Sequence, residues 1–502
     1  MLQEKALAKF MKQVLLGLCL AVAAAAAGKD PAGFDALVES ANGVAAEFSA
    51  DALIRLAQAE EAGPARRREL LEEAFRRAAG AQQPLKRRAI LAPRNGPSGF
   101  LDRAYAQELD ANSLQCRAVR AMLPLDRKKA RELFREIPVP QLPRLTCDDP
   151  LVYDLSLYYE TLAEVVKTAF TPAEAAGDEP FKLVTDYVRG LTSPAQVAPL
   201  ARLLATAPLK PAQTEALVMT FAGALKDFAG DDRSFTFSIT RAGRLGPRIA
   251  ELAAACAKLG IATTPLVEGY RAYLVRHLGG DRCGESADQP GISFGIKLNA
   301  DEELALDPVR FFNEKLRSDP VKPIAADEIV PGKVAGAAGG LRSCESPECR
   351  NLAKLYTGLV LGPNGMPYGP DLKAGSEWQA KVKEYLAALA AWKDDPAASA
   401  AEQFQQKCLF YSDVMNLVPN SADRLAVLRS FLDFLKQNSF QRENRIEWFL
   451  PVNSLIARVS LDPVGLSDLL RDLRNSGDPV ITLYTQLEER VPRPPGERLS
   501  IL

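Results

Sequence analysis

The chain has 502 residues, more than one ordinary domain contains, so we expect a large core divided over two or three units. Its 47% hydrophobic and 25% charged residues exclude a disordered chain and a protein with many membrane spans. The 62 basic and 63 acidic residues nearly cancel, so no overall field attracts nucleic acid, and we predict no nucleic-acid partner. Aromatic residues total 7%, which together with abundant Ala and Leu favours helix over sheet.

The first 27 residues have the pattern of a secretory signal peptide. Lys5, Lys9 and Lys12 precede an apolar run over residues 14–22, and small alanines follow up to Ala27. The run is shorter than the roughly 20 residues that span a bilayer, so we expect cleavage after Ala27 and no stable membrane span in the mature protein. The sequence therefore predicts an exported protein, either periplasmic or extracellular.

Proline follows a residue that can cap a helix at eight places, and each pair predicts a helix start. The pairs are Asp30–Pro31, Asp149–Pro150, Ser193–Pro194, Thr264–Pro265, Asp307–Pro308, Asp395–Pro396, Asp462–Pro463 and Asp478–Pro479. Apolar stripes at three-four spacing follow several of them, so we expect about fifteen helices. One strand is expected, over Ser234 to Ile239, where polar and apolar residues alternate.

The predicted fold class is all-α, with stacked helix hairpins in an irregular, solenoid-like arrangement. After the signal peptide of residues 1–27, we expect a helical-hairpin region over residues 28–278. A Gly/Pro-rich irregular connection follows over 279–350, interrupted by one helix at 308–316. A second helical region covers 351–490, and the proline-rich residues 491–502 form an extended tail.

Two segments resemble the second helix of a tetratricopeptide unit, namely Leu71-x3-Phe75-x2-Ala78 and Ala130-x3-Phe134-x2-Ile137. Their spacing is 59 residues rather than the 34 of that repeat, and the first-helix signature is missing. The resemblance therefore implies helix hairpins without a regular repeat. The chain as a whole also resembles uncharacterised exported α-helical proteins of bacteria, which implies no activity.

Cleavage of the signal peptide leaves seven of the eight cysteines, and some should pair in an oxidising compartment. The best local candidate is Cys344 with Cys349, because the four residues between them can form a turn. An odd number leaves at least one thiol unpaired. Cys256 lies in an alanine-rich run, which is typical of a small buried side chain.

The histidine content restricts the metal sites and catalytic motifs that the chain can form, because His277 is the single histidine. Metal motifs that need two histidines are excluded, and we expect no cofactor and no metal site. His277 lies in the last turn of a predicted helix, where a packing or capping role is expected and a cationic ring would favour the helix dipole. Gly291-x-Ser293-x-Gly295 has the spacing of a nucleophile elbow but no histidine after the serine.

Two function classes follow from these observations. Stacked helix hairpins without a catalytic motif predict a non-catalytic exported scaffold for protein–protein interaction, with no assigned catalytic residue. The alternative is a cell-wall or polysaccharide-cleaving enzyme, because Glu345–Ser346 resembles the acid of the superhelical lytic transglycosylases. In this alternative Glu345 is the acid, and Asp154 and Glu160, from an acidic and aromatic cluster, form a second possible carboxylate pair.

Overall fold

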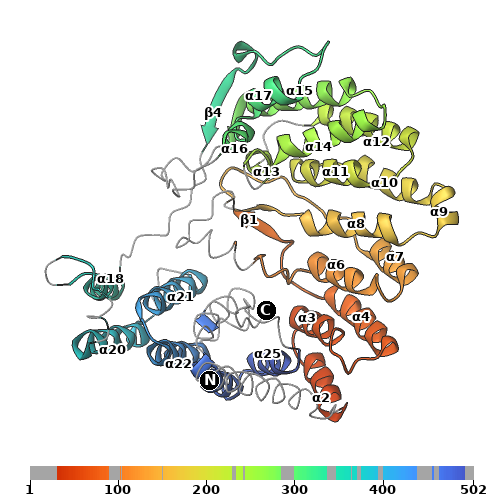
Figure 1. Cartoon of the computed structure of the whole chain (residues 1–502). Helices are drawn as coiled ribbons and strands as arrows, with labels where there is room; N and C mark the ends of the chain where they lie inside the picture. Colours follow the sequence, from red (N-terminus) through yellow and green to blue (C-terminus); the bar gives the residue numbers. More distant parts are fainter. Residues whose placement is uncertain are drawn as a thin grey trace, which may run out of the picture.

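The computed structural model describes residues 31–89, 102, 105–149, 151–228, 233–240, 243–283, 299–335, 346–362, 365–369, 373, 375–393, 399–437, 455–456 and 463–491. These residues form 21 α-helices and two small two-stranded sheets, so the predicted all-α class is confirmed (Figure 1). The number of helices exceeds the expected fifteen. Short helices such as α9 (Pro172–Ala176) and α16 (Ala300–Ala305) have no apolar stripe, so the sequence pattern does not predict them.

The first half of the chain folds into two layers of helices. The A layer consists of α3 (Ala46–Leu56), α6 (Ala111–Met122), α8 (Ser156–Thr168), α11 (Pro194–Thr206) and α14 (Leu245–Lys258), and each contacts the next. The B layer consists of α4 (Pro64–Ala78), α7 (Arg127–Glu136), α10 (Glu179–Arg189), α12 (Pro211–Asp227) and α15 (Thr264–Leu278). Figure 1 shows much of the B layer on the outside of the curve. These contacts fit stacked hairpins, while the solenoid arrangement stays a prediction.

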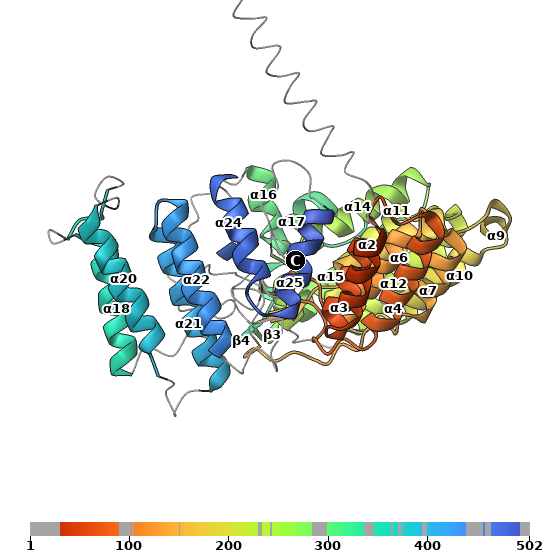
Figure 2. The ribbon, with the colours of Figure 1, turned by 90° about the horizontal axis from the view of Figure 1, so that it is seen from below.

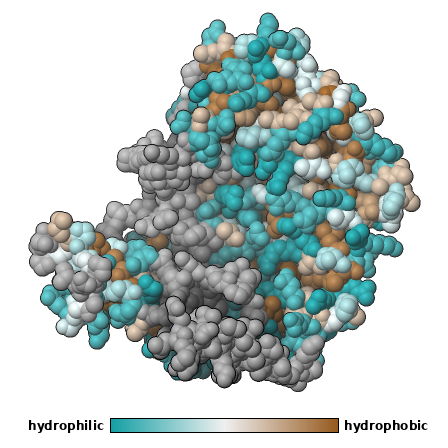
Figure 3. Space-filling model, viewed as in Figure 1, coloured by the Kyte–Doolittle hydropathy of each residue, from teal (hydrophilic) through white to brown (hydrophobic). Residues whose placement is uncertain are grey.

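The apolar stripes of the sequence form the core between these layers. Leu70, Leu71, Ala74 and Phe75 of α4 are buried, as are Val197, Leu200, Leu203 and Leu204 of α11. Hydrophilic residues cover much of the described surface, with hydrophobic residues scattered among them (Figure 3). No helix in the described part combines the length and the apolar composition needed to cross a membrane.

Helices α12 and α15 pack closely because α15 has a glycine at the contact. A Cβ atom at Gly269 would lie 2.5 Å from the carbonyl oxygen of Ala222 on α12. A side chain of any size therefore cannot fit there unless the two helices move apart.

We expect Gly269→Ala to lower the free energy of unfolding by about 1 to 3 kcal/mol, because the added methyl group overpacks the contact between α12 and α15. Gly223→Ala on α12 is the matched control, since no atom lies within 4 Å of the place its Cβ would occupy. That control should instead raise stability by about 0.5 to 1 kcal/mol through helix propensity. Urea denaturation measures both, and equal effects of the two substitutions would contradict the close contact.

Several of the predicted helix starts are observed. Ser193, Asp307 and Asp478 each accept a hydrogen bond from the first turn of the helix that follows, α11, α17 (Pro308–Phe311) and α25 (Pro479–Arg490) respectively. Helices α2 (Pro31–Asn42) and α24 (Pro463–Arg474) also begin at the expected prolines, and α15 begins at Thr264. The pair Asp395–Pro396 lies outside the described residues.

Two local expectations are wrong. The segment expected to be a strand at Ser234 to Ile239 is instead the helix α13 (Arg233–Ser238), which is largely buried and packs against the strand that contains Leu151–Tyr153. A helix satisfies its backbone groups within itself and needs no partner strand. The helix expected after Asp149 is absent, because residues Leu151–Tyr153 form strand β2. This strand pairs antiparallel with β1 (Arg87–Ala89), and Arg88 lies opposite Val152.

The connection expected at 279–350 contains more structure than its composition indicates. Strands β3 (Gly280–Cys283) and β4 (Pro331–Ala335) pair in parallel. The predicted helix at 308–316 is divided into α17 and a π-helical turn, η1 (Phe312–Leu316), and a 3-10 turn, η2 (Ala326–Glu328), follows. Helix α18 (Pro347–Val360) already begins within the expected connection.

The C-terminal helices bring the chain back to the N-terminal helices α2 and α3. Helices α18, α20 (Ser376–Ala391), α21 (Ala400–Leu417), α22 (Ser421–Gln437), α24 and α25 follow one another in a row, shown in Figure 2. Helix α25 then contacts both α2 and α3, so the first and last helices of the described chain lie side by side (Figures 1 and 2).

A disulfide joins Cys147 to Cys283, which are 136 residues apart in the sequence. Cys349 is also disulfide-bonded, but its expected partner Cys344 lies outside the described residues, so that pairing stays a prediction. Among the described residues Cys116, Cys256 and Cys408 are buried thiols outside any disulfide, and burial raises the pKa of the Cys256 thiol. The interpretation of Cys256 as a small buried side chain is thus confirmed.

Non-reducing peptide mapping should recover a fragment that links Cys147 to Cys283. Because this bond closes a long loop, we expect Cys147→Ser to lower the free energy of unfolding by about 2 to 5 kcal/mol. Cys256→Ala removes a free thiol and serves as the control, since the fragment map should stay the same. Recovery of Cys147 with a free thiol from oxidised protein would contradict the assignment.

Candidate functional site

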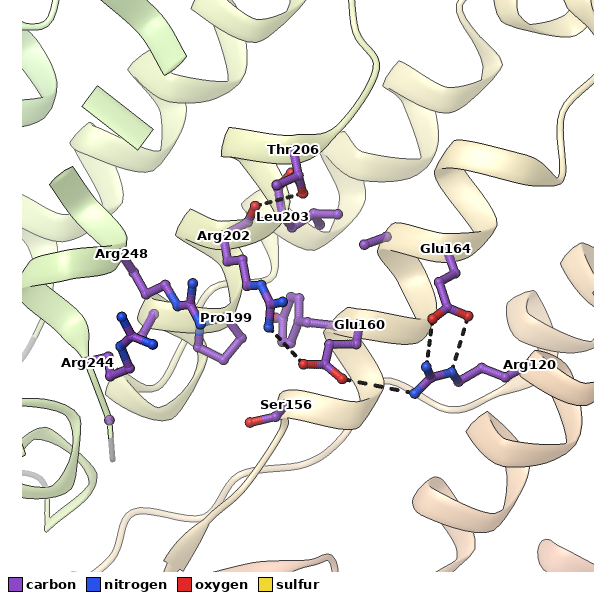
Figure 4. Close-up of a pocket in the computed structure, with 14 residues that line it drawn as sticks. Arg120, Ser156, Glu160, Glu164, Pro199, Arg202, Leu203, Thr206, Arg244 and Arg248 are labelled. Atoms are coloured by element: carbon purple, nitrogen blue, oxygen red, sulfur yellow. Dashed lines mark hydrogen bonds and ion pairs between the residues drawn. The ribbon is translucent and has the colours of Figure 1, made fainter. Parts of the chain in front are cut away.

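The A layer contains a cavity of about 380 Å³ between α6, α8, α11 and the first turn of α14. Four arginines and two glutamates line it, and we call it the arginine cavity. Its charged residues are Arg120, Glu160, Glu164, Arg202, Arg244 and Arg248 (Figure 4). Each of four successive segments thus contributes charged groups to one cavity.

Helical spacing explains why these side chains meet. Glu160 and Glu164 are four residues apart on α8 and therefore project from the same face. Arg120 comes from α6 on one side of α8, and Arg202 comes from α11 on the other side. Both neighbouring helices contact α8, so each glutamate has an arginine within reach.

Ion pairs connect the three helices. Arg120 donates two hydrogen bonds to Glu164, at 2.7 and 3.2 Å, and lies 4.0 Å from Glu160. Arg202 donates to Glu160 at 2.8 Å (Figure 4). Side-chain exposures between 37% and 47% place these pairs at the surface, where one ion pair contributes little to stability. Their main effect is to fix the positions of the charges.

The arginines at the start of α14 are placed differently. Arg248 pairs with Glu251 at 2.7 Å, one turn further along the same helix. The Arg244 side chain is exposed and makes no hydrogen bond or ion pair with any residue that the structure describes. Figure 4 shows Arg244 and Arg248 side by side at one end of the cavity. The cavity therefore has more cationic than anionic groups.

Small apolar side chains form the wall behind these charges. Ala163 of α8 and Ala198, Pro199 and Leu203 of α11 line the cavity together with the aromatic ring of Tyr159. A site with an apolar wall and a few fixed charges is suited to bind a side chain rather than a bare ion.

Asp154, one of the predicted site residues, is not part of the cavity lining. Its carboxylate is nearly buried and lies 3.6 Å from Lys86 and 3.4 Å from Arg88, and it accepts a hydrogen bond from the backbone of Ser156. Burial raises the pKa of Asp154, but the two cations and the hydrogen bond outweigh burial and lower it overall. Asp154 is therefore an ionised residue that holds β1 and α8 in place.

In the described part of the chain, the structure does not bring together the other residues that the enzyme alternative requires. Glu160 lies in the arginine cavity, whereas Glu345 and the Ser293 motif lie outside the described residues. Tyr158, which follows Asp154 in the acidic and aromatic cluster, is buried. It lines a second cavity of about 350 Å³ with Tyr187 and Val139. The structure thus brings Glu160 together with arginines and not with a second candidate acid.

His277 is a packing residue. Its ring is 2% exposed, stacks on Phe235 at 4.7 Å between ring centroids and lies 4.4 Å from the ring of Tyr273. Burial, together with the charges of Arg276 and Arg144, lowers the pKa of His277 to about 4. The expected packing role of His277 is therefore confirmed, and the ring is neutral at ordinary pH, so that it contributes no charge to the helix dipole.

The arginine cavity was not predicted from the sequence. Arg120, Arg202 and Arg244 come from three separate segments of the sequence, and no motif connects them. The pair Glu160 and Glu164 was the one local signal, because its spacing places two carboxylates on one helix face. Among the residues that the structure describes, no group of three or more His, Cys, Asp or Glu is placed to hold a metal ion.

Comparison with protein-family models, with curated proteins and with solved structures finds no match to this chain.

Proposed function

We propose that the protein is an exported, non-catalytic helical scaffold that binds a protein partner on its A layer, around the arginine cavity. The observation that carries the proposal is the cavity itself, to which α6, α8, α11 and the start of α14 all contribute charged groups. Stacked helix pairs provide extended surfaces of this kind for gripping another protein. The disulfide between Cys147 and Cys283 is compatible with export to an oxidising compartment.

The carboxylates of the cavity support a scaffold better than an enzyme. A general acid needs a carboxyl oxygen directed at the substrate, whereas hydrogen bonds from arginine side chains occupy the oxygens of these two residues. Glu160 and Glu164 both accept such bonds. The polysaccharide-cleaving alternative stays a prediction that depends on Glu345.

Site-specific photo-crosslinking in the native cell tests the scaffold. A photoreactive residue at Thr206, on the exposed rim of the cavity, should give one discrete adduct with a partner protein. Met219 of α12 is 51% exposed on the B layer and is the matched control, where this adduct should be absent.

The proposal would be overturned by identical adducts at Thr206 and Met219, or by no adduct at Thr206. Release of soluble fragments from peptidoglycan by the purified protein, lost in Glu160→Gln or Glu345→Gln, would favour the enzyme instead.

A further inference from the structure

We infer that the arginine cavity binds a carboxylate side chain from an acidic segment of the partner, with Arg244 as the group that pairs with it. The inference rests on the proposed function and names the chemistry of the segment that the A layer recognises. It follows from the charges of the cavity, from the state of Arg244 and from the apolar wall.

Charge complementarity favours an anion. Four guanidinium groups face two carboxylates in the cavity, so an added negative group meets a net attraction. Three of the arginines already have a carboxylate partner: Arg202 pairs with Glu160, Arg120 with Glu164, and Arg248 with Glu251. Arg244 is thus the cavity arginine without a carboxylate among the described residues.

Arg244 is also held in an unusual place. Its backbone has φ 53° and ψ 31°, in the left-handed region that disfavours a side chain with a Cβ atom. It immediately precedes α14, and its carbonyl oxygen accepts the first helical hydrogen bond, from Arg248 at 3.0 Å. A guanidinium at this position can donate two parallel hydrogen bonds to one carboxylate. A strained residue on a cavity wall fits a role in binding.

The cavity fits an acidic peptide better than a phosphate ion. The net positive charge of the cavity attracts both kinds of anion, so the apolar wall makes the distinction between them. The apolar surface of Ala163, Ala198 and Leu203 can contact the aliphatic part of a peptide, whereas a small ion leaves it exposed to water. We therefore assign the cavity to an Asp or Glu side chain flanked by small apolar residues.

Fluorescence anisotropy with the full mature chain tests the inference. The probe is a labelled six-residue peptide of alternating Ala and Glu, and the comparison peptide has Gln in place of Glu. We expect the Glu peptide to bind more tightly by at least tenfold and its affinity to fall with added salt. Arg244→Gln should weaken binding about tenfold or more. Arg310→Gln, an exposed arginine of α17 outside the cavity that pairs with Glu314, should leave it unchanged.

Glu160→Gln should change the affinity for the Glu peptide in the opposite direction. Removal of this carboxylate frees Arg202 and lowers the repulsion, so we expect the Glu peptide to bind several-fold more tightly. A loss of affinity in this variant would overturn the inference. Equal binding of the Glu and Gln peptides, or displacement of the Glu peptide by inorganic phosphate at equal concentration, would also overturn it.

The two proposals fail in different ways. If the Thr206 adduct persists in Arg244→Gln, the scaffold stands and the assignment of a carboxylate to Arg244 is wrong. If Thr206 gives no adduct even in the unchanged chain, the proposed function itself is wrong. Loss of the adduct in Arg244→Gln and its retention in Arg310→Gln would support both.

Discussion

Asp51→Ala is expected to lower the free energy of unfolding by about 3 to 5 kcal/mol, because it leaves a largely buried arginine without its counter-charge. Asp51 is 3% exposed and accepts hydrogen bonds from Arg117 on α6 and from the hydroxyl of Tyr484 on α25, the latter at 2.7 Å. Beside it Arg55 donates to Glu488 at 2.5 Å. This network joins α3 and α6 to α25, so its loss should also release α25.

Urea denaturation measures the stability of Asp51→Ala, and amide hydrogen exchange over residues 479–490 reports the release of α25. Glu132→Ala is the control, since Glu132 lies 3.9 Å from Lys128 in an exposed pair and its removal should change little. Unchanged exchange over α25 together with unchanged stability would show that the network does not hold α25 against α3 and α6.

The same carboxylate predicts a pH dependence. Burial raises the pKa of Asp51, but Arg117, Arg55 and Tyr484 outweigh burial and lower it overall. Because the folded protein holds this proton more weakly than the unfolded chain, the stabilisation is present above the ordinary pKa of aspartate, near 4. It is lost as the pH falls through the lowered value. Asp51→Ala should therefore lose less stability than the unchanged chain when the pH falls below about 4.

The second large effect is acid destabilisation by His277. Its pKa is about 4 in the folded protein because the ring is buried among aromatic residues. In the unfolded chain the ordinary value near 6.5 applies, so the unfolded state binds a proton that the folded state does not. Stability should fall as the pH falls from about 6.5 to 4. Between pH 7.5 and pH 4.5 this one residue should cost about 2 to 3 kcal/mol.

His277→Phe keeps an aromatic ring next to Phe235 and Tyr273 but cannot titrate. Its loss of stability between pH 7.5 and pH 4.5 should be smaller than that of the unchanged chain by the same 2 to 3 kcal/mol. Because His277 is the single histidine, its imidazole signals can be followed directly by NMR as the pH is lowered. A measured pKa near 6.5 in the folded protein would contradict the prediction.

Local features were predictable because they depend on residues three or four positions apart. Ser193, Asp307 and Asp478 cap helices through hydrogen bonds to the next turn, and the sequence contains both partners of each bond. The stripe from Leu70 to Phe75 was likewise sufficient to indicate a buried helix face. From these signals the sequence by itself determined the all-α class and many of its helix starts.

The tertiary structure decided everything that depends on distant parts of the chain. Ser234 to Ile239 alternates like a strand, yet Arg233–Ser238 forms a helix in its buried place against α11 and the strands β2 and β3, because tertiary packing outweighs local strand propensity. Cys147 meets Cys283, and Asp51 meets Tyr484, over separations of 136 and 433 residues. The arginine cavity likewise needs four segments in fixed positions. Such long-range contacts depend on the path of the whole backbone, so they cannot be inferred from the spacing of residues in the sequence.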